Sequence, residues 1–163
     1  MQAENPLWQR IAKFHPDKPG VSLPFSKRLA LENGWSRRYA LRVVEEYKRF
    51  AFLACFAQHP VTPSEEIDQA WHLHLVYTRS YWEDFCGTVL QCPLHHAPTE
   101  GGKNELSKYI AQYEKTLQTY QEVFGHAPPG DIWPPAKQRF ASGLWRWVSL
   151  RKYWVVRKLF FNT

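Results

Sequence analysis

The chain has 163 residues, a hydrophobic fraction of 44% and a formal net charge of +6. This length fits one domain, and the hydrophobic content is sufficient for a packed core, which excludes an intrinsically disordered chain. No stretch approaches about 18 uncharged apolar residues, and the N-terminal residues lack the apolar run of a signal peptide, so we expect neither a spanning helix nor a secretory leader.

Apolar residues recur at steps of three and four along most of the chain, which is the helical period. Gly34 and Gly125 are natural helix ends, and Ser36 is a natural cap for the start of a helix. Another helix should start at Thr62 or Ser64, and it should extend to about Phe85 or Leu90. The predicted helices cover residues 25–33, 37–58, 62 or 64 to about 85 or 90, 104–124 and a stretch from about 137 onward.

No segment shows the alternation of a β-strand, so the sequence predicts an all-α, single-domain bundle of four or five helices with a basic aromatic C-terminal helix. We divide the chain into a helical domain with a histidine-rich motif, residues 1–135, and a basic aromatic segment, residues 136–163. The C-terminal segment has no acidic residue, and the rest of the chain is close to neutral.

Asp68 and His72 lie four residues apart on the predicted third helix, so their side chains share one face. A carboxylate and an imidazole at this spacing can both reach one metal ion. They can equally form an exposed Asp–His hydrogen bond, and the spacing leaves both interpretations open. His74 points away from His72, so a regular helix does not direct both imidazoles at one ion.

His74 belongs to the apolar arc of this helix, which is the expected core face. A histidine there can be a core residue that bonds Tyr81 or Thr78, or a general base with a pKa lowered by desolvation. His74 and Tyr81 are therefore the candidate catalytic residues. The arc consists of Ile67, Trp71, His74, Thr78, Tyr81 and Phe85.

His95 and His96 stand side by side in the loop "CPLHHAPTEGG", where prolines and glycines restrict the backbone. We predict a site for a divalent ion (zinc, iron or manganese) made by Asp68, His72 and this histidine pair. The spacing of Cys86 and Cys92 is not that of a zinc finger. No phosphate-binding fingerprint is present, so no nucleotide cofactor is expected.

The chain has three cysteines, an odd number that argues against a disulfide framework. Disulfides are rare where thiols are kept reduced, so we expect a cytoplasmic protein, with peripheral contact to the inner membrane as an addition.

The stretches "VTPSEEIDQAWHLHLVYTRSYWEDFC", "LHHAPTEGG" and "FGHAPPGDIWP" resemble the glycine-rich domain-containing protein-like family over roughly residues 25–135. Its hallmark is D-x-x-W-H-x-H on a helix, which corresponds here to Asp68, Trp71, His72 and His74. The resemblance implies that Asp68, His72, His74, His95 and His96 act together, and it implies no particular activity. The chain departs from the family name, since it has eight glycines and no glycine-rich tract.

Two classes of function follow from these features. The first is a metal-binding helical domain of unassigned activity, which includes a metal-dependent enzyme. The second is a non-enzymatic interaction module, in which the histidines are structural and residues 136–163 bind an anionic membrane surface or a protein partner. Nucleic acid is not an expected partner, because the body of the chain is near neutral and no recognition motif is visible.

Overall fold

The structure is a computed structural model, and it describes residues 4–97 and 103–141. Within this part of the chain there are seven helical segments and no strand, so the predicted all-α class is confirmed. None of these described helices is long and apolar enough to cross a membrane. The segments are α1 (Pro6–Lys13), α2 (Phe25–Asn33), α3 (Arg37–Phe56), α4 (Glu65–Val76), the π-helix η1 (Ser80–Leu90), α5 (Lys103–Phe124) and α6 (Ala136–Arg139).

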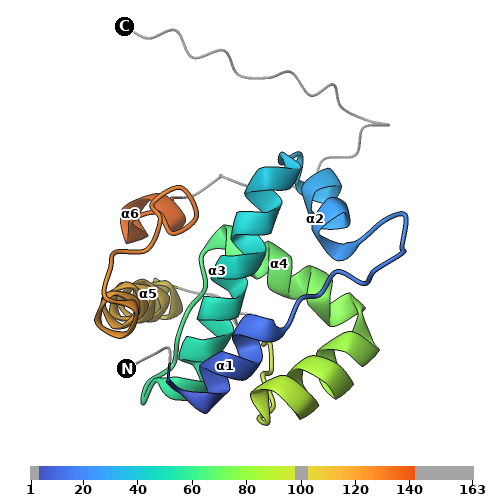
Figure 1. Cartoon of the computed structure of the whole chain (residues 1–163). Coiled ribbons are helices and arrows are strands. Elements are labelled where there is room, and N and C mark those ends of the chain that lie inside the picture. The colour runs from blue at the N-terminus through green and yellow to red at the C-terminus, as the bar shows by residue number, and fades with distance from the viewer. Residues whose placement is uncertain (1–3, 98–102, 142–163) are drawn as a thin grey trace, which may run out of the picture.

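Helix α3 is the centre of the molecule. It runs between α1, α2, α4 and η1 on one side and α5 and α6 on the other (Figure 1). Its inward residues Val43, Tyr47, Phe50 and Leu53 are each at most 1% exposed, and α3 contacts α1, α2, α4, η1 and α5. Burial of such side chains contributes about 1.5–3 kcal/mol each, which makes α3 the largest contributor to the core.

The ends of α2 and α3 follow the sequence signals. Gly34 closes α2 in the left-handed conformation, with φ of 66°, which glycine adopts without steric cost. The hydroxyl of Ser36 then accepts a hydrogen bond from the backbone N–H of Tyr39 at 3.2 Å, which caps the start of α3.

The sequence predicted one continuous helix that ends near Phe85 or Leu90, but the structure has two separate helical segments in this region. The helical stretch starts as α4 with Ser64 as its cap, breaks at Tyr77, and resumes at Ser80 as η1. The backbone N–H of Tyr77 bonds the carbonyl of His74 at 3.0 Å, a shorter step than the α-helical one. The break explains why Thr78 is exposed although every other residue of the predicted apolar arc is buried.

Helix α1 was not predicted. The side chain of Asn5 accepts a hydrogen bond from the N–H of Leu7 at 2.9 Å, and Pro6 occupies the first helical turn. An N-cap residue followed by proline is a start signal that the sequence does contain. The helix buries Ile11 completely, and Trp8 packs edge-on against Phe52 at 5.6 Å.

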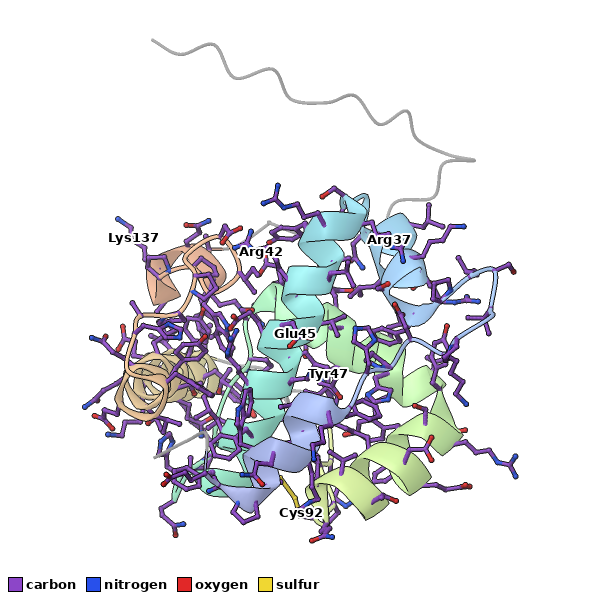
Figure 2. The ribbon with its side chains drawn as sticks, viewed as in Figure 1. Arg37, Arg42, Glu45, Tyr47, Cys92 and Lys137 are labelled. Carbon is purple, nitrogen blue, oxygen red and sulfur yellow. A yellow bond between two sulfur atoms is a disulfide. The ribbon has the colours of Figure 1, made fainter. Side chains whose placement is uncertain are left out.

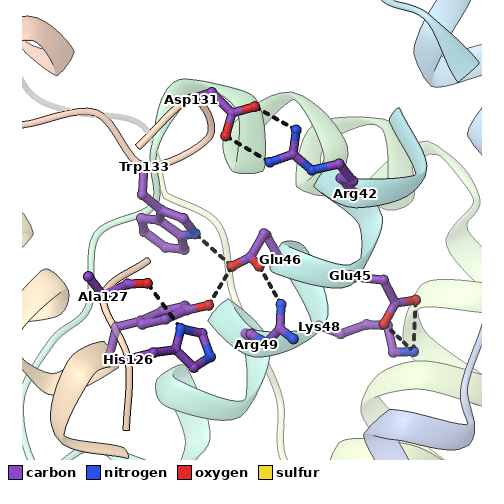
Figure 3. Close-up of polar contacts among 10 residues, drawn as sticks. Arg42, Glu45, Glu46, Lys48, Arg49, His126, Ala127, Asp131 and Trp133 are labelled. Atoms are coloured by element: carbon purple, nitrogen blue, oxygen red, sulfur yellow. Dashed lines mark hydrogen bonds and ion pairs between the residues drawn. The ribbon is translucent and has the colours of Figure 1, made fainter. Parts of the chain in front are cut away.

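The segment between α5 and α6 is fastened to α3 by buried polar contacts (Figure 3). The carboxylate of Glu46, which is 5% exposed, accepts hydrogen bonds from the indole N–H of Trp133 at 3.0 Å and the hydroxyl of Tyr120 at 2.9 Å. Nearer the surface, Arg42 forms a bidentate pair with Asp131 at 2.6 and 2.8 Å. These bonds hold the "GDIWPP" segment, and with it α6, against the core.

Two of the three cysteines are paired, although their odd number argued against a disulfide framework. Cys55 at the end of α3 and Cys92 after η1 form a disulfide across 37 residues (Figure 2), while Cys86 is free and buried. An odd count excludes only the complete pairing of all cysteines, and it says nothing about two residues that the fold places side by side.

The predicted basic aromatic helix falls mostly on residues 142–163, which lie outside the described residues. Its first turn is α6, which packs against α5 and buries Ala136. Phe140 lies edge-on to Tyr113 at 5.8 Å, so this first turn contributes to the folded domain.

Candidate metal site

The first part of the site is the N-terminal half of α4. The hydroxyl of Ser64 caps the helix by accepting a hydrogen bond from the backbone N–H of Ile67 at 3.3 Å. The backbone carbonyl of Ser64 accepts a second hydrogen bond, from the N–H of Asp68. Because α4 is a regular α-helix here, Asp68 and His72 fall one turn apart on one face. Their side chains approach to 3.5 Å, from Oδ2 of Asp68 to Nδ1 of His72.

The loop after η1 supplies the third member. Nε2 of His96 lies 2.8 Å from Oδ1 of Asp68, and the rings of His96 and His72 are 4.3 Å apart. One ligand atom each from Asp68, His72 and His96 lies within 4.8 Å of the other two. The structure therefore brings together three of the four predicted ligands, from two segments of the chain.

The fourth predicted ligand, His95, lies outside this cluster. Its ring packs against that of Trp82 at 5.3 Å, and the residue is exposed. His95 and His96 both line the cavity described below, but only His96 has a ring nitrogen next to the Asp68 carboxylate. Their adjacency in the sequence could not indicate which of the two points toward Asp68.

Tyr81 holds the loop in this position. Its hydroxyl donates a hydrogen bond to the carbonyl of Leu94, two residues before His96, and accepts one from the indole N–H of Trp71 at 2.8 Å. Tyr81 is fully buried, and burial raises its pKa well above the ordinary value of 10.0, so the hydroxyl keeps its proton and remains a donor. The structure thus places this catalytic candidate in a positioning role, away from solvent.

His74, the other catalytic candidate, is in the core. It is 0% exposed, with Nδ1 at 3.0 Å from the hydroxyl of Tyr47 and Nε2 at 3.3 Å from that of Ser80. Aromatic rings of Phe14 and Phe25 pack around it. Desolvation lowers its pKa from 6.5 to about 4, so the imidazole is neutral at pH 7. Both ring nitrogens therefore have partners in the core.

A cavity of about 710 Å³ opens beside the cluster, and both Asp68 and His96 line it. The remaining wall comes from the segment before α4, from α5 and from the end of α6. The sequence contains no local signal for the α5 part, since Lys108 and Tyr109 belong to the wall only because α5 packs beside the segment before α4, where Thr116 accepts a hydrogen bond from the N–H of Thr62. Lys108 and Tyr109 were missed.

The three residues of the cluster offer two nitrogen ligands and one carboxylate. This set suits zinc or iron(II), and three protein ligands leave coordination positions for water or another molecule. A metal ion bound here would polarise such a molecule or lower the pKa of a bound water. The cavity lies next to these open coordination positions and has room for a molecule larger than water.

The fold and the cluster together define an all-helical domain with an Asp–His–His cluster at the edge of a cavity. Residues 25–123 match the model of the UCP032817-like family, and the chain belongs to this family. The resemblance to the glycine-rich domain-containing protein-like family is therefore wrong, because the match over the helical body assigns the chain to a different and uncharacterised family. A few motif positions around Asp68 and His72 were not enough to distinguish the two. No curated protein and no solved structure matches the chain.

Proposed function

We propose that this protein binds one divalent transition-metal ion through Asp68, His72 and His96, and that the ion, with an open coordination position, is its functional centre. The observation that carries the proposal is the position of the Asp68 carboxylate between two imidazoles, one oxygen at 2.8 Å from His96 and the other at 3.5 Å from His72.

Zinc–ligand distances of about 2.0–2.2 Å bring the ligand atoms of one ion roughly 3–4 Å apart. The two separations from Asp68 are already close to this range. The His72 side chain is 50% exposed, so a small turn of its ring brings its nitrogen closer to that of His96. This rotation would bring the three ligand atoms closer to the spacing that one ion requires.

The neighbourhood of His96 favours a defined ligand over a mobile surface histidine. Its side chain is 19% exposed and its ring packs on Trp71 at 4.5 Å. Packing of this kind fixes the ring orientation, which is what a metal ligand requires. Asp68 and His96 are largely buried, whereas His72 is half exposed. The exposed side at His72 leaves a path by which the ion can enter the site.

Titration calorimetry with zinc and, anaerobically, with iron(II) tests the proposal on the full chain without a histidine tag. We expect one ion per chain and a dissociation constant that rises at least tenfold in His96→Gln, a typical loss when a site loses a ligand or its orienting partner. His95→Gln is the matched control, since His95 is the adjacent residue and lies outside the cluster. Equal weakening in both variants, or no uptake by the wild type, contradicts the proposal.

A further inference from the structure

The cavity beside the cluster has the size of a small-molecule site. Its volume is about 710 Å³, within the roughly 300–1,000 Å³ of typical ligand pockets. Asp68 and His96 are both in its wall, so a molecule in the cavity borders the metal site directly. One water molecule occupies only about 30 Å³, so the cavity has room for a much larger molecule.

Most of the wall is apolar. Trp71 forms the part next to His96, and Val61 comes from the segment before α4. Leu106 and Tyr109 come from α5, and Phe140 follows α6. Three aromatic rings and two branched side chains favour a ligand with a flat or aliphatic body.

The polar part of the wall is basic once an ion is bound. Arg139 is neutralised by Glu65, with Nη1 at 2.9 Å from Oε2. Lys108 is exposed at the cavity, and no carboxylate among the described residues pairs with it. Asp68 is the one acidic residue of the wall within that described part, and its charge is more than offset by a divalent ion. The balance therefore favours an anionic ligand.

We propose that the cavity binds a small organic carboxylate with an aromatic or aliphatic body, whose carboxylate faces the metal ion and Lys108 while its body lies between Trp71, Tyr109 and Phe140. The inference rests on the proposed function, because the ion supplies most of the positive charge.

The test uses the full chain loaded with one equivalent of zinc, and phenylacetate as the probe. Calorimetry or NMR titration should give phenylacetate an affinity at least roughly tenfold higher than that of phenylethanol, which has the same ring and no charge. Lys108→Ala should lower the affinity for phenylacetate by roughly threefold to fivefold, as expected for the loss of a partly exposed charge. Lys115→Ala, an exposed lysine further along α5 and outside the cavity, is the matched control and should leave the affinity unchanged.

Leu106→Glu provides a second variant that the fold tolerates, because Leu106 is 47% exposed. The added negative charge at the cavity should weaken phenylacetate binding and leave zinc binding intact. Stoichiometric zinc without phenylacetate binding overturns the inference and leaves the metal site standing. Equal affinities for the acid and the alcohol, or affinities unchanged in both Lys108→Ala and Leu106→Glu, also overturn it. Failure to take up zinc is seen before the probe is added, and it contradicts the proposed function itself.

Discussion

Asp68 and His96 are 28 residues apart in the sequence, yet Nε2 of His96 lies 2.8 Å from Oδ1 of Asp68. The contact joins α4 to the loop that follows η1, and it turns an ordinary i,i+4 pair of one helix into a three-residue cluster. Its existence depends on how the loop is held, and the loop is held from the core by Tyr81.

Replacement of Tyr81 by Phe tests this dependence. The variant loses the bond to the Leu94 carbonyl and the acceptor for the Trp71 indole, so we expect a loss of about 1–3 kcal/mol in the free energy of unfolding. Because the loop loses its fixed position, zinc affinity should fall as well. Chemical denaturation and zinc calorimetry measure the two effects.

Tyr113→Phe is the matched control for this variant. Tyr113 is also fully buried and donates one hydrogen bond to a backbone carbonyl, that of Pro134 at 2.7 Å, away from the cluster. It should lower stability by less, because only one hydrogen bond is lost, and it should leave zinc affinity unchanged. If Tyr81→Phe behaves in the same way as Tyr113→Phe in both measurements, Tyr81 does not position the loop.

The buried His74 makes stability depend on pH. Its folded pKa of about 4 lies below the ordinary value of 6.5, so between these values the unfolded chain binds a proton that the folded chain does not. Stability is therefore fully present above pH 6.5 and falls as the pH drops toward 4. The contribution of this one group over that window is about 3 kcal/mol.

Urea denaturation at pH 7 and pH 5 measures this effect. His74→Gln cannot be protonated, so it should lose less stability than the wild type between the two pH values, although it is less stable at pH 7 because the contacts to Tyr47 and Ser80 change. His15→Gln, at an exposed position, should follow the wild-type curve. Parallel losses in His74→Gln and wild type would show that His74 is not the responsible group.

We predict that the hydrogen bonds of Glu46 are the main polar contacts that hold the segment before α6 against α3. Glu46→Ala leaves the buried N–H of Trp133 and the hydroxyl of Tyr120 without their acceptor, and each such group costs about 1–3 kcal/mol. We expect a lower midpoint of unfolding and faster proteolysis between Gly125 and Pro135. Glu32→Ala, at an exposed residue with an i,i+4 pair to Arg28, should stay within about 0.5 kcal/mol of the wild type. A small effect of Glu46→Ala would mean that Glu46 is not the main polar contact that holds the segment.

Local geometry explains what the sequence could predict. The pairing of Asp68 with His72 follows from the helical repeat, and the burial of Trp71, His74 and Tyr81 follows from the apolar arc. The break at Tyr77 was hidden, because both Tyr81 and Phe85 still face the core after the π-helix begins. Periodicity reports which positions are buried more reliably than it reports where one helix ends.

Tertiary contacts decide the rest. The choice of His96 over His95 depends on the orientation of a loop that is fixed by the bond between Tyr81 and the Leu94 carbonyl. The contribution of Lys108 to the cavity depends on the packing of α5 beside the segment before α4. Neither relation has a spacing or composition signal, so neither was predictable from the sequence.

The metal content of the purified protein tests the central claim most directly. The full chain is prepared without a histidine tag, dialysed against metal-free buffer and analysed by mass spectrometry for zinc, iron and manganese, alongside Asp68→Asn. Asn is nearly the same size as Asp and carries no charge, so the variant should fold and bind metal poorly. We predict about one ion per wild-type chain and a large loss in Asp68→Asn. A wild-type protein free of all three metals, which also takes up none when they are added back, would contradict the account.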